Sequence, residues 1–245
     1  MDQVFLTITD NKRIARDVYR MVLTGDVGAV TAPGQFVNLA LSGRFLRRPI
    51  SVCDRDADSV TLLYKVVGQG TAQMAEMPAG QRLDVLTGLG NGFDLDAAHG
   101  HTLLIGGGIG AAPLYWLARE LKSRGVDMTA VLGFNGAEDV FYEKEFSALC
   151  DRVILATADG SRGVRGFVTD AMAGLSYDFF YACGPEPMLK AVWRASTSDG
   201  ELSFEERMGC GFGACMGCSC KTLTGFKRIC KDGPVLRKGE ITWAD

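Results

Sequence analysis

The chain has 245 residues, of which 47% are hydrophobic and 22% charged, and its formal net charge is −3. This composition is typical of a globular protein with one large or two modest domains. The small net charge, without long blocks of like charge, argues against nucleic acid or an anionic membrane as a partner. No apolar run reaches the roughly 18 residues of a membrane span, and the N-terminus lacks a signal-peptide pattern, so we expect a cytoplasmic protein.

The first part of the chain, residues 1–99, alternates short apolar segments with turn-rich ones. The segments "VFLTIT", "DVYRMVL", "QFVNLAL", "RPISVC" and "SVTLLYKVV" have the pattern of strands, and pieces such as "TAPG" and "DRDADS" separate them. Such spacing predicts an antiparallel barrel or a sandwich. The one helix expected in this part covers residues 70–77.

The rhythm changes after residue 100. A buried strand, "TLLIGGG", is followed by an amphipathic helix, "APLYWLARELKSRG", and by another strand, "DMTAVLGF". The alternation continues to about residue 199 and predicts a parallel sheet covered by helices on both faces. His99 and His101 fall in the connector before this part, where a solvated linker explains them better than catalysis.

Residues 200–245 are rich in glycine and cysteine and too few to build a core of their own. Cys210, Cys215 and Cys218 give the spacing C-x4-C-x2-C, and Cys230 follows after eleven intervening residues. This spacing is the plant-type ferredoxin pattern for a [2Fe–2S] cluster. Eight cysteines in a reducing cytosol also favour metal or redox chemistry over disulfides.

Two alternatives stay open for these cysteines. Four thiolates would also suit a tetrahedral zinc ion, which would make the tail a structural clasp. Cys220 could replace Cys218 as a ligand, but Cys218 keeps the x2 spacing, so we interpret Cys220 as a buried thiol near the cluster. Cys53 and Cys150 are interpreted as small buried hydrophobes.

A glycine-rich turn and a second motif indicate a nucleotide site in the middle part. The turn "GGGIG" contains Gly107, Gly108 and Gly110 between a strand and a helix, where backbone N–H groups can face a pyrophosphate. The motif "CGP", residues 183–185, ends a later strand of the same expected sheet and could line the same crevice. Either motif alone could serve only close packing.

In the N-terminal part, "RRPIS" places Arg48 and Ser51 three residues apart on one strand, where they could face a phosphate-bearing ligand or could simply form a polar strand end. Downstream, "LYKVVGQGT" places Gly70 and Thr71 at the start of the short helix, another feature suited to phosphate.

The order of these parts resembles the ferredoxin-reductase superfamily and, within it, the electron-transfer subunits of B-type dihydroorotate dehydrogenases. The similarity covers essentially the whole chain and rests on "LRRPISV", "LYKVVGQGT", "GLGNGFDL", "IGGGIGAAPL", "YACGPEPML", "ERMGCGFGACMGCSC" and "CKDGPV". It implies an α+β multidomain fold with an FAD-binding antiparallel β-barrel at 1–99, an NAD-binding α/β domain with a parallel sheet at 100–199 and a small [2Fe–2S] domain at 200–245.

The resemblance also implies which residues hold the cofactors. FAD would be held by Arg48, Pro49, Ile50, Ser51, Leu63, Tyr64, Lys65, Gly70 and Thr71. NAD(H), as co-substrate, would meet Gly107, Gly108, Gly110, Cys183, Gly184 and Pro185. The cluster ligands would be Cys210, Cys215, Cys218 and Cys230. Ferredoxin reductases often carry an aromatic residue where this chain has Pro49 and Ile50. These two residues instead match the dihydroorotate subunits.

In that family, electrons pass between NAD and the FMN of a separate catalytic subunit through FAD and the cluster, in a heterotetramer of two plus two chains. No acid–base triad is needed, so we expect no catalytic side chain of that kind. Glu138 and Asp139 would repel the 2′-phosphate of NADPH, whereas Arg162 and Arg165 could attract it; the resemblance favours NADH. The alternatives are a reductase subunit for another partner, of the sulfide dehydrogenase or hydrogenase type, and a zinc-stabilised binding module.

Overall fold

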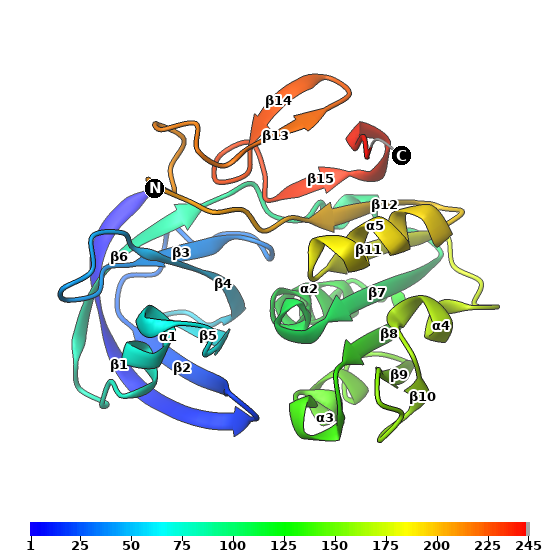
Figure 1. Ribbon diagram of the computed structural model, residues 1–245, viewed down its shortest axis with the longest axis horizontal. Helices are drawn as coiled ribbons and strands as arrows, with labels where there is room; N and C mark the ends of the chain where they lie inside the picture. Colours follow the sequence, from blue (N-terminus) through cyan, green and yellow to red (C-terminus); the bar gives the residue numbers. More distant parts are fainter. Residues whose placement is uncertain (244–245) are drawn as a thin grey trace.

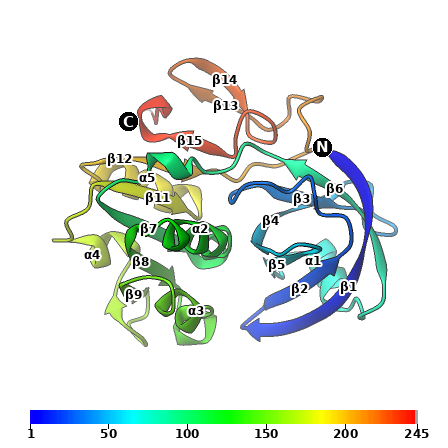
Figure 2. The ribbon, with the colours of Figure 1, turned by 180° about the vertical axis from the view of Figure 1, so that it is seen from behind.

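The computed structural model describes residues 1–243. A β-barrel and an α/β sheet lie beside each other, and the C-terminal segment runs across one end of both (Figure 1 and, from behind, Figure 2). Among the described residues, no helix is both long and apolar enough to cross a membrane.

The barrel is closed, with neighbouring strands in the order β1-β2-β5-β4-β3-β6 and antiparallel pairing throughout. Its elements are β1 (Asp2–Ala15), β2 (Val18–Thr24), β3 (Phe36–Leu39), β4 (Arg48–Arg55), β5 (Ser59–Lys65), α1 (Gln69–Ala75) and β6 (Arg82–Leu89). Alternate residues fill the interior, as along β6, where Leu83 and Val85 are buried. The barrel confirms the first of the two predicted architectures, and its closing strand, β6, was not expected.

The second sheet has the strand order β10-β9-β8-β7-β11-β12-β15. Its strands are β7 (His101–Gly107), β8 (Asp127–Phe134), β9 (Arg152–Thr157), β10 (Val164–Arg165), β11 (Phe179–Cys183), β12 (Asp199–Ser203) and β15 (Val235–Arg237). All neighbours pair in parallel except β12 and β15. The predicted parallel sheet is therefore confirmed, and one antiparallel strand extends it.

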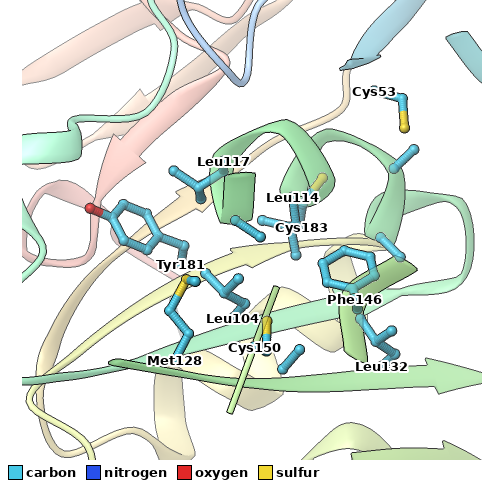
Figure 3. Packing of buried hydrophobic residues seen from close by; sticks show 14 of the residues in the cluster. Cys53, Leu104, Leu114, Leu117, Met128, Leu132, Phe146, Cys150, Tyr181 and Cys183 are labelled. Atoms are coloured by element: carbon cyan, nitrogen blue, oxygen red, sulfur yellow. The ribbon is translucent and has the colours of Figure 1, made fainter. Parts of the chain in front are cut away.

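Helices cover both faces of this sheet, namely α2 (Ala112–Ser123), α3 (Glu143–Ser147), α4 (Val168–Met172) and α5 (Glu186–Ala195). The strands alternate accordingly, because Leu104 of β7 packs with α2 and α3, whereas Leu103 and Ile105 pack with α4 and α5. Figure 3 shows the α2 side, where Cys150 and Cys183 are buried among Leu104, Leu114 and Phe146. Cys53, from the barrel, lies in the same core, so the two parts share buried surface.

Residues 204–234 connect β12 to β15 and contain the predicted cluster ligands. Within them lies a short hairpin of β13 (Ser219–Thr222) and β14 (Gly225–Arg228). The predicted boundary between residues 199 and 200 falls inside β12, and β15 pairs with β12 from Glu201–Arg237 to Ser203–Val235. The cysteine-containing segment is thus an insertion between two adjacent strands of the central sheet.

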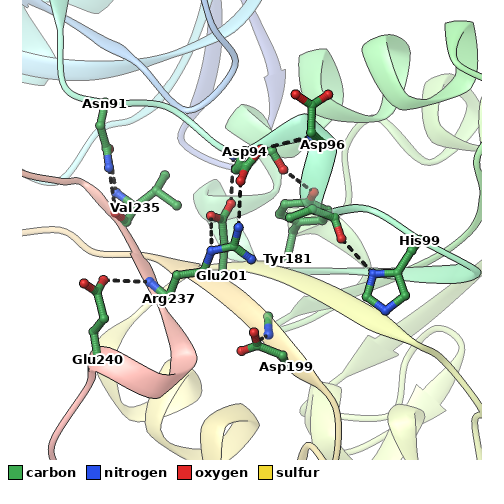
Figure 4. A network of polar contacts seen from close by, with 12 residues as sticks. Asn91, Asp94, Asp96, His99, Tyr181, Asp199, Glu201, Val235, Arg237 and Glu240 are labelled. Carbon is green, nitrogen blue, oxygen red and sulfur yellow. Dashed lines mark hydrogen bonds and ion pairs between the residues drawn. The ribbon is translucent and has the colours of Figure 1, made fainter.

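The connector between barrel and sheet is tied to these two strands by a polar network (Figure 4). Asp94 lies before the 3₁₀ helix η1 (Leu95–Ala97), its carboxylate pairs with Arg237 Nη2 at 2.6 Å, and its N–H donates to Glu201 at 2.9 Å. The Tyr181 hydroxyl donates to the Asp94 carbonyl at 2.6 Å. Further 3₁₀ turns are η2 (Gly108–Ala111), η3 (Ala137–Asp139) and η4 (Lys238–Glu240).

Candidate functional site

A cavity of about 570 Å³ lies at the carboxyl ends of the central strands, next to the barrel. Ligands of open α/β sheets bind at this edge. The residues of its wall that the sequence singled out are Lys65, Gly107, Gly108, Gly110, Asp139, Gly184 and Pro185. The "GGGIG" and "CGP" motifs therefore line one cavity, and Lys65 contributes to it from the barrel.

The two motifs touch through glycines. A Cβ atom on Gly110 would lie 2.5 Å from the Cys183 carbonyl oxygen, and one on Gly107 would lie 2.2 Å from Met188 Sδ. Gly108 has a φ of +53°, a left-handed conformation that glycine adopts readily. The turn thus needs glycine for close packing and, at Gly108, for its backbone conformation. The Cys183 side chain is 2% exposed and packs in the core, so burial raises its pKa strongly.

Arg48 and Gly70 are brought together from separate segments. A Cβ on Gly70 would lie 2.1 Å from Arg48 Nε, so the guanidinium rests on the backbone at the start of α1. Arg48 Nη1 donates to the Leu46 carbonyl at 2.5 Å. Pro49, Ile50 and Ser51 follow on β4 and are half-buried. The "RRPIS" strand and the "GQGT" turn consequently form one surface.

Residues 63–65 on β5 alternate in direction. Leu63 packs in the core shared with the sheet, Tyr64 is 1% exposed in the barrel core, and Lys65 lines the cavity. The Tyr64 hydroxyl donates to Asn11 at 2.9 Å, and burial raises its pKa beyond the usual range. Only the backbone of Tyr64 is left to meet a ligand.

Thr71 uses its hydroxyl within the turn. Its Oγ1 accepts the N–H groups of Val67 and Gly68 at 3.0 and 3.2 Å and donates to the Gly68 carbonyl at 3.1 Å. The side chain therefore fixes the shape of the loop that leads into α1.

The four predicted cluster ligands lie as two pairs. The thiols of Cys210 and Cys215 lie close enough to affect each other's ionisation, and so do those of Cys218 and Cys230. Among residues 1–243, no three Cys, His, Asp or Glu side chains surround a single ion position. A cluster of two irons takes two protein ligands on each iron, and the two pairs fit that requirement.

Backbone N–H groups point at the sulfurs, as an anionic cluster requires. Cys210 Sγ accepts from the N–H groups of Ala214 and Cys215 at 3.3 and 3.4 Å, and Cys218 Sγ accepts from Cys230 N–H at 3.4 Å. Burial opposes ionisation of Cys210, but these N–H groups outweigh it, and its pKa falls to about 6. These N–H groups therefore favour the thiolate form of Cys210, whereas burial raises the pKa of Cys230 to about 12.

The two pairs differ in exposure. Cys218 and Cys230 are 3% and 2% exposed and pack in the core on the α4 and α5 side, whereas Cys215 is exposed. Cys220 lies on β13 and is half-buried, and burial raises its pKa. Its thiol belongs to neither pair, and it is half-buried where a buried thiol was expected.

Several residues that line or adjoin these sites were not anticipated. Glu205 lines the cavity five residues before Cys210. Phe167 lines the same cavity although it is 70% exposed. Asn38, on β3, donates to the Cys210 carbonyl at 3.4 Å. None of the three lies in the stretches on which the similarity rests, although Glu205 directly precedes "ERMGCG".

The acidic residues predicted to oppose a 2′-phosphate differ in their surroundings. Asp139 is 5% exposed, lines the cavity and is paired with Arg16 at 2.6 Å, whereas the Glu138 side chain is 77% exposed. Arg162 is paired with Glu143. Of the two acidic residues, Asp139 therefore faces the cavity, and both Asp139 and Arg162 are engaged in ion pairs.

Comparison with protein families matches residues 205–242 to the iron–sulfur cluster binding domain of dihydroorotate dehydrogenase B and residues 104–194 to the oxidoreductase NAD-binding domain. The chain is 46% identical to the dihydroorotate dehydrogenase B (NAD(+)) electron transfer subunit of Geobacillus sp. (strain WCH70), over 98% of this chain and 99% of that one. The chain belongs to this family. A further member, from Fusobacterium nucleatum subsp. nucleatum, is 43% identical over 96% of both chains.

Solved structures share the fold of this chain. A NADH-dependent reduced ferredoxin-NADP oxidoreductase, described for flavin-based electron bifurcation, superimposes with a TM-score of 0.89 and 32% identity, over 97% of this electron transfer subunit and 90% of that chain. A ferredoxin NADP+ reductase from Neisseria gonorrhoeae with bound FAD and NADP shares the fold, with a TM-score of 0.69 and 18% identity over 79% and 89%. The predicted combination of barrel, α/β domain and cluster segment is confirmed.

Proposed function

We propose that this chain transfers electrons between NAD(H) and the FMN of a dihydroorotate dehydrogenase catalytic subunit, by way of FAD and a [2Fe–2S] cluster, in pyrimidine biosynthesis. Two such chains would assemble with two catalytic subunits in the cytoplasm. The observation that carries the proposal is the pairing of the four cysteine thiols beside a barrel and a nucleotide cavity. Family membership supplies the dihydroorotate branch of the assignment.

FAD, when bound, can exchange two electrons with a nicotinamide and single electrons with an iron–sulfur cluster. The residues proposed to hold it are those of β4, of the end of β5 and of the turn into α1. Arg48 offers a guanidinium held against Gly70, and the loop that Thr71 braces offers backbone N–H groups for phosphate. Lys65 would lie where this surface meets the cavity.

The cavity residues are proposed to bind and orient NAD(H). Gly107, Gly108 and Gly110 leave the backbone open to the pyrophosphate, and the Gly184–Pro185 turn closes the opposite wall. Cys183 would contribute its backbone, since its side chain lies in the core. Asp139 would disfavour a 2′-phosphate, which supports NADH as the nucleotide.

A reductase for another acceptor is the second candidate function. It is favoured by the similarity to the ferredoxin-NADP oxidoreductase, whose name describes different partners. The two functions make different demands on the acceptor: only the first requires an FMN-containing dihydroorotate oxidising subunit.

The first experiment determines iron, acid-labile sulfide and flavin in anaerobically purified protein, together with its visible spectrum before and after NADH. We expect about two irons and one FAD per chain and bleaching by NADH. A colourless protein with one zinc would overturn the proposal. Electron transfer to a co-expressed dihydroorotate dehydrogenase catalytic subunit then separates the two candidate partners.

A matched pair of substitutions in the cysteine segment separates the role of the cluster from that of the flavin. Cys215→Ser removes a proposed ligand, so we expect loss of the cluster spectrum and of electron delivery to the catalytic subunit, with NADH-dependent dye reduction by the flavin retained. Cys220→Ser changes the cysteine outside both pairs and should retain every activity. Equal loss of dye reduction and partner reduction in Cys215→Ser would contradict the proposal that flavin and cluster are separate redox centres.

A further inference from the structure

We propose that Asn38 is a positioning residue that fixes the outer cluster loop, residues 208–217, against the flavin-binding strands and so sets electron transfer between flavin and cluster. The inference rests on the proposed function, because it concerns how the flavin site and the cluster site are held together. Asn38 lies on β3, in the barrel, and the loop it contacts lies 172 residues further along the chain.

The carboxamide of Asn38 is buried between barrel and loop. The residue is 1% exposed, its Nδ2 donates to the Cys210 carbonyl at 3.4 Å, and its Oδ1 is buried without a hydrogen-bond partner among the described residues. An unsatisfied buried amide oxygen is unfavourable and uncommon in native proteins. An apolar side chain would avoid that cost, so the amide at this position has a use other than filling space.

The backbone that carries Asn38 is held firmly. Asn38 is directly opposite Pro49 in the β3–β4 pair, so it neighbours the proposed flavin strand. Arg47 Nη1 donates to the Asn38 carbonyl at 3.3 Å, and Arg47 Nη2 is paired with Asp84 of β6 at 2.8 Å. The Asn38 side chain therefore extends from a fixed point on the flavin side.

The backbone of the loop lies close to this amide at Gly211. Gly211, the residue after Cys210, has a φ of +79°, and a Cβ on it would lie 2.3 Å from Asn38 Nδ2. A side chain at Gly211 would force either the loop or the Asn38 amide to move. The absence of a side chain at Gly211 and the presence of the amide at Asn38 are two separate features that define the same contact.

The contact matters because the two cysteine pairs are anchored differently. Cys218 and Cys230 are packed in the core with Phe36, whereas the pair Cys210 and Cys215 lies on the exposed outer loop. Within residues 1–243, the Asn38 bond is the hydrogen bond that joins this loop to the barrel. Removing it should free the outer half of the cluster site while the inner half stays in place.

The test compares single-atom changes that keep side-chain volume. Asn38→Asp removes the donor to Cys210, and Gln35→Glu, the control, removes a donor from another buried barrel amide, whose Nε2 bonds the Gly90 carbonyl at 3.1 Å. Stopped-flow absorbance follows flavin and cluster reduction by NADH separately, and redox titration with electron paramagnetic resonance gives the cluster potential and g-values. We expect Asn38→Asp to slow cluster reduction roughly tenfold and to shift potential and g-values, with flavin reduction unchanged.

Gly211→Ala disturbs the same contact from the loop side and should change the cluster signal in the same way, which covers a failure of Asn38→Asp to fold. Wild-type cluster kinetics and g-values in Asn38→Asp would overturn the inference, and so would the same changes in Gln35→Glu. If the wild-type protein itself lacks flavin or cluster, the proposed function fails instead, so the two failures are distinguishable.

Discussion

Glu201 gives the chain a pH-dependent stability that can be measured directly. It lies on β12, its side chain is 6% exposed, and it is in contact with charged groups from two other segments. Arg237 Nε lies 3.2 Å from its Oε1, and the Asp94 N–H donates to its Oε2 (Figure 4). Burial outweighs both favourable contacts and, with the nearby carboxylates of Asp94 and Asp199, raises the pKa of Glu201 to about 7.

The sign follows from which state binds the proton more tightly. The folded protein holds the Glu201 proton up to about pH 7, whereas the unfolded chain releases it near 4.5. Between these values the unfolded state is favoured as the pH rises. Each pH unit in this window is worth about 1.4 kcal/mol, so the carboxyl group costs about 3 kcal/mol of folding free energy once the pH exceeds 7.

The perturbation is Glu201→Gln, which keeps the shape and the acceptor for the Asp94 N–H but cannot ionise. We expect the free energy of unfolding of wild type to fall by about 2 kcal/mol between pH 5.5 and pH 7.5 relative to that of the variant. The measurement is anaerobic denaturant unfolding at several pH values, followed by circular dichroism and by loss of the cluster spectrum. Glu76→Gln, at an exposed position after α1, is the control and should follow the wild-type curve.

Parallel pH profiles for wild type and Glu201→Gln would refute this reasoning. They would mean that the ion pair with Arg237 compensates for burial and that Glu201 stays ionised throughout the range.

Three further predictions concern other parts of the molecule. The side chain in Gly110→Val should clash with the Cys183 carbonyl and lower the free energy of unfolding by about 1–3 kcal/mol. It should also raise the KM for NADH in dye reduction, whereas an unchanged KM would place the nucleotide elsewhere. Arg47→Ala removes the hydrogen-bonded ion pair with Asp84, in which Arg47 lowers the pKa of the carboxyl group. We expect the free energy of unfolding, measured by thermal melts at pH 7, to fall by about 1–2 kcal/mol. A variant as stable as wild type would show that the pair contributes nothing. NADH should be preferred to NADPH by kcat/KM because Asp139 lies in the cavity wall; the opposite preference would mean that Arg165 or Arg162 recognises a 2′-phosphate.

The strands of the barrel and the sheet could be predicted where local sequence is consistent with burial. β7 and β11, "HTLLIGG" and "FFYAC", are short apolar runs buried on both faces, as parallel strands are. The four cysteines proposed as cluster ligands could be singled out from the sequence, because three of them are within nine residues and their spacing is typical of a cluster loop.

Other elements depend on partners far away in the chain. β12, "DGELS", contains residues that disfavour strands, and Glu201 is acceptable in its centre only because Arg237 and Asp94 meet it there. β6 alternates clearly from Arg82 to Val85, but its second half places Leu86 outward and Thr87 inward and contains Gly88, which obscures the pattern. Asn38 has no local signal at all, since its role arises from a contact with a distant loop.

The attachment of the cysteine segment explains how one loop can serve two cofactor regions. Because β12 and β15 are neighbours in the central sheet, residues 204–234 begin and end on the structure that forms the nucleotide cavity. Asn91, in the connector that follows the barrel, donates to the Val235 carbonyl at 2.8 Å and accepts from the Val235 N–H at 3.1 Å. Near the other end of the segment, Asn38 donates to the Cys210 carbonyl. The ends of the segment are thus fixed by the sheet and its sides by the barrel and connector. A cluster held there keeps one position relative to both flavin and nicotinamide, whereas a tail attached at one end would not.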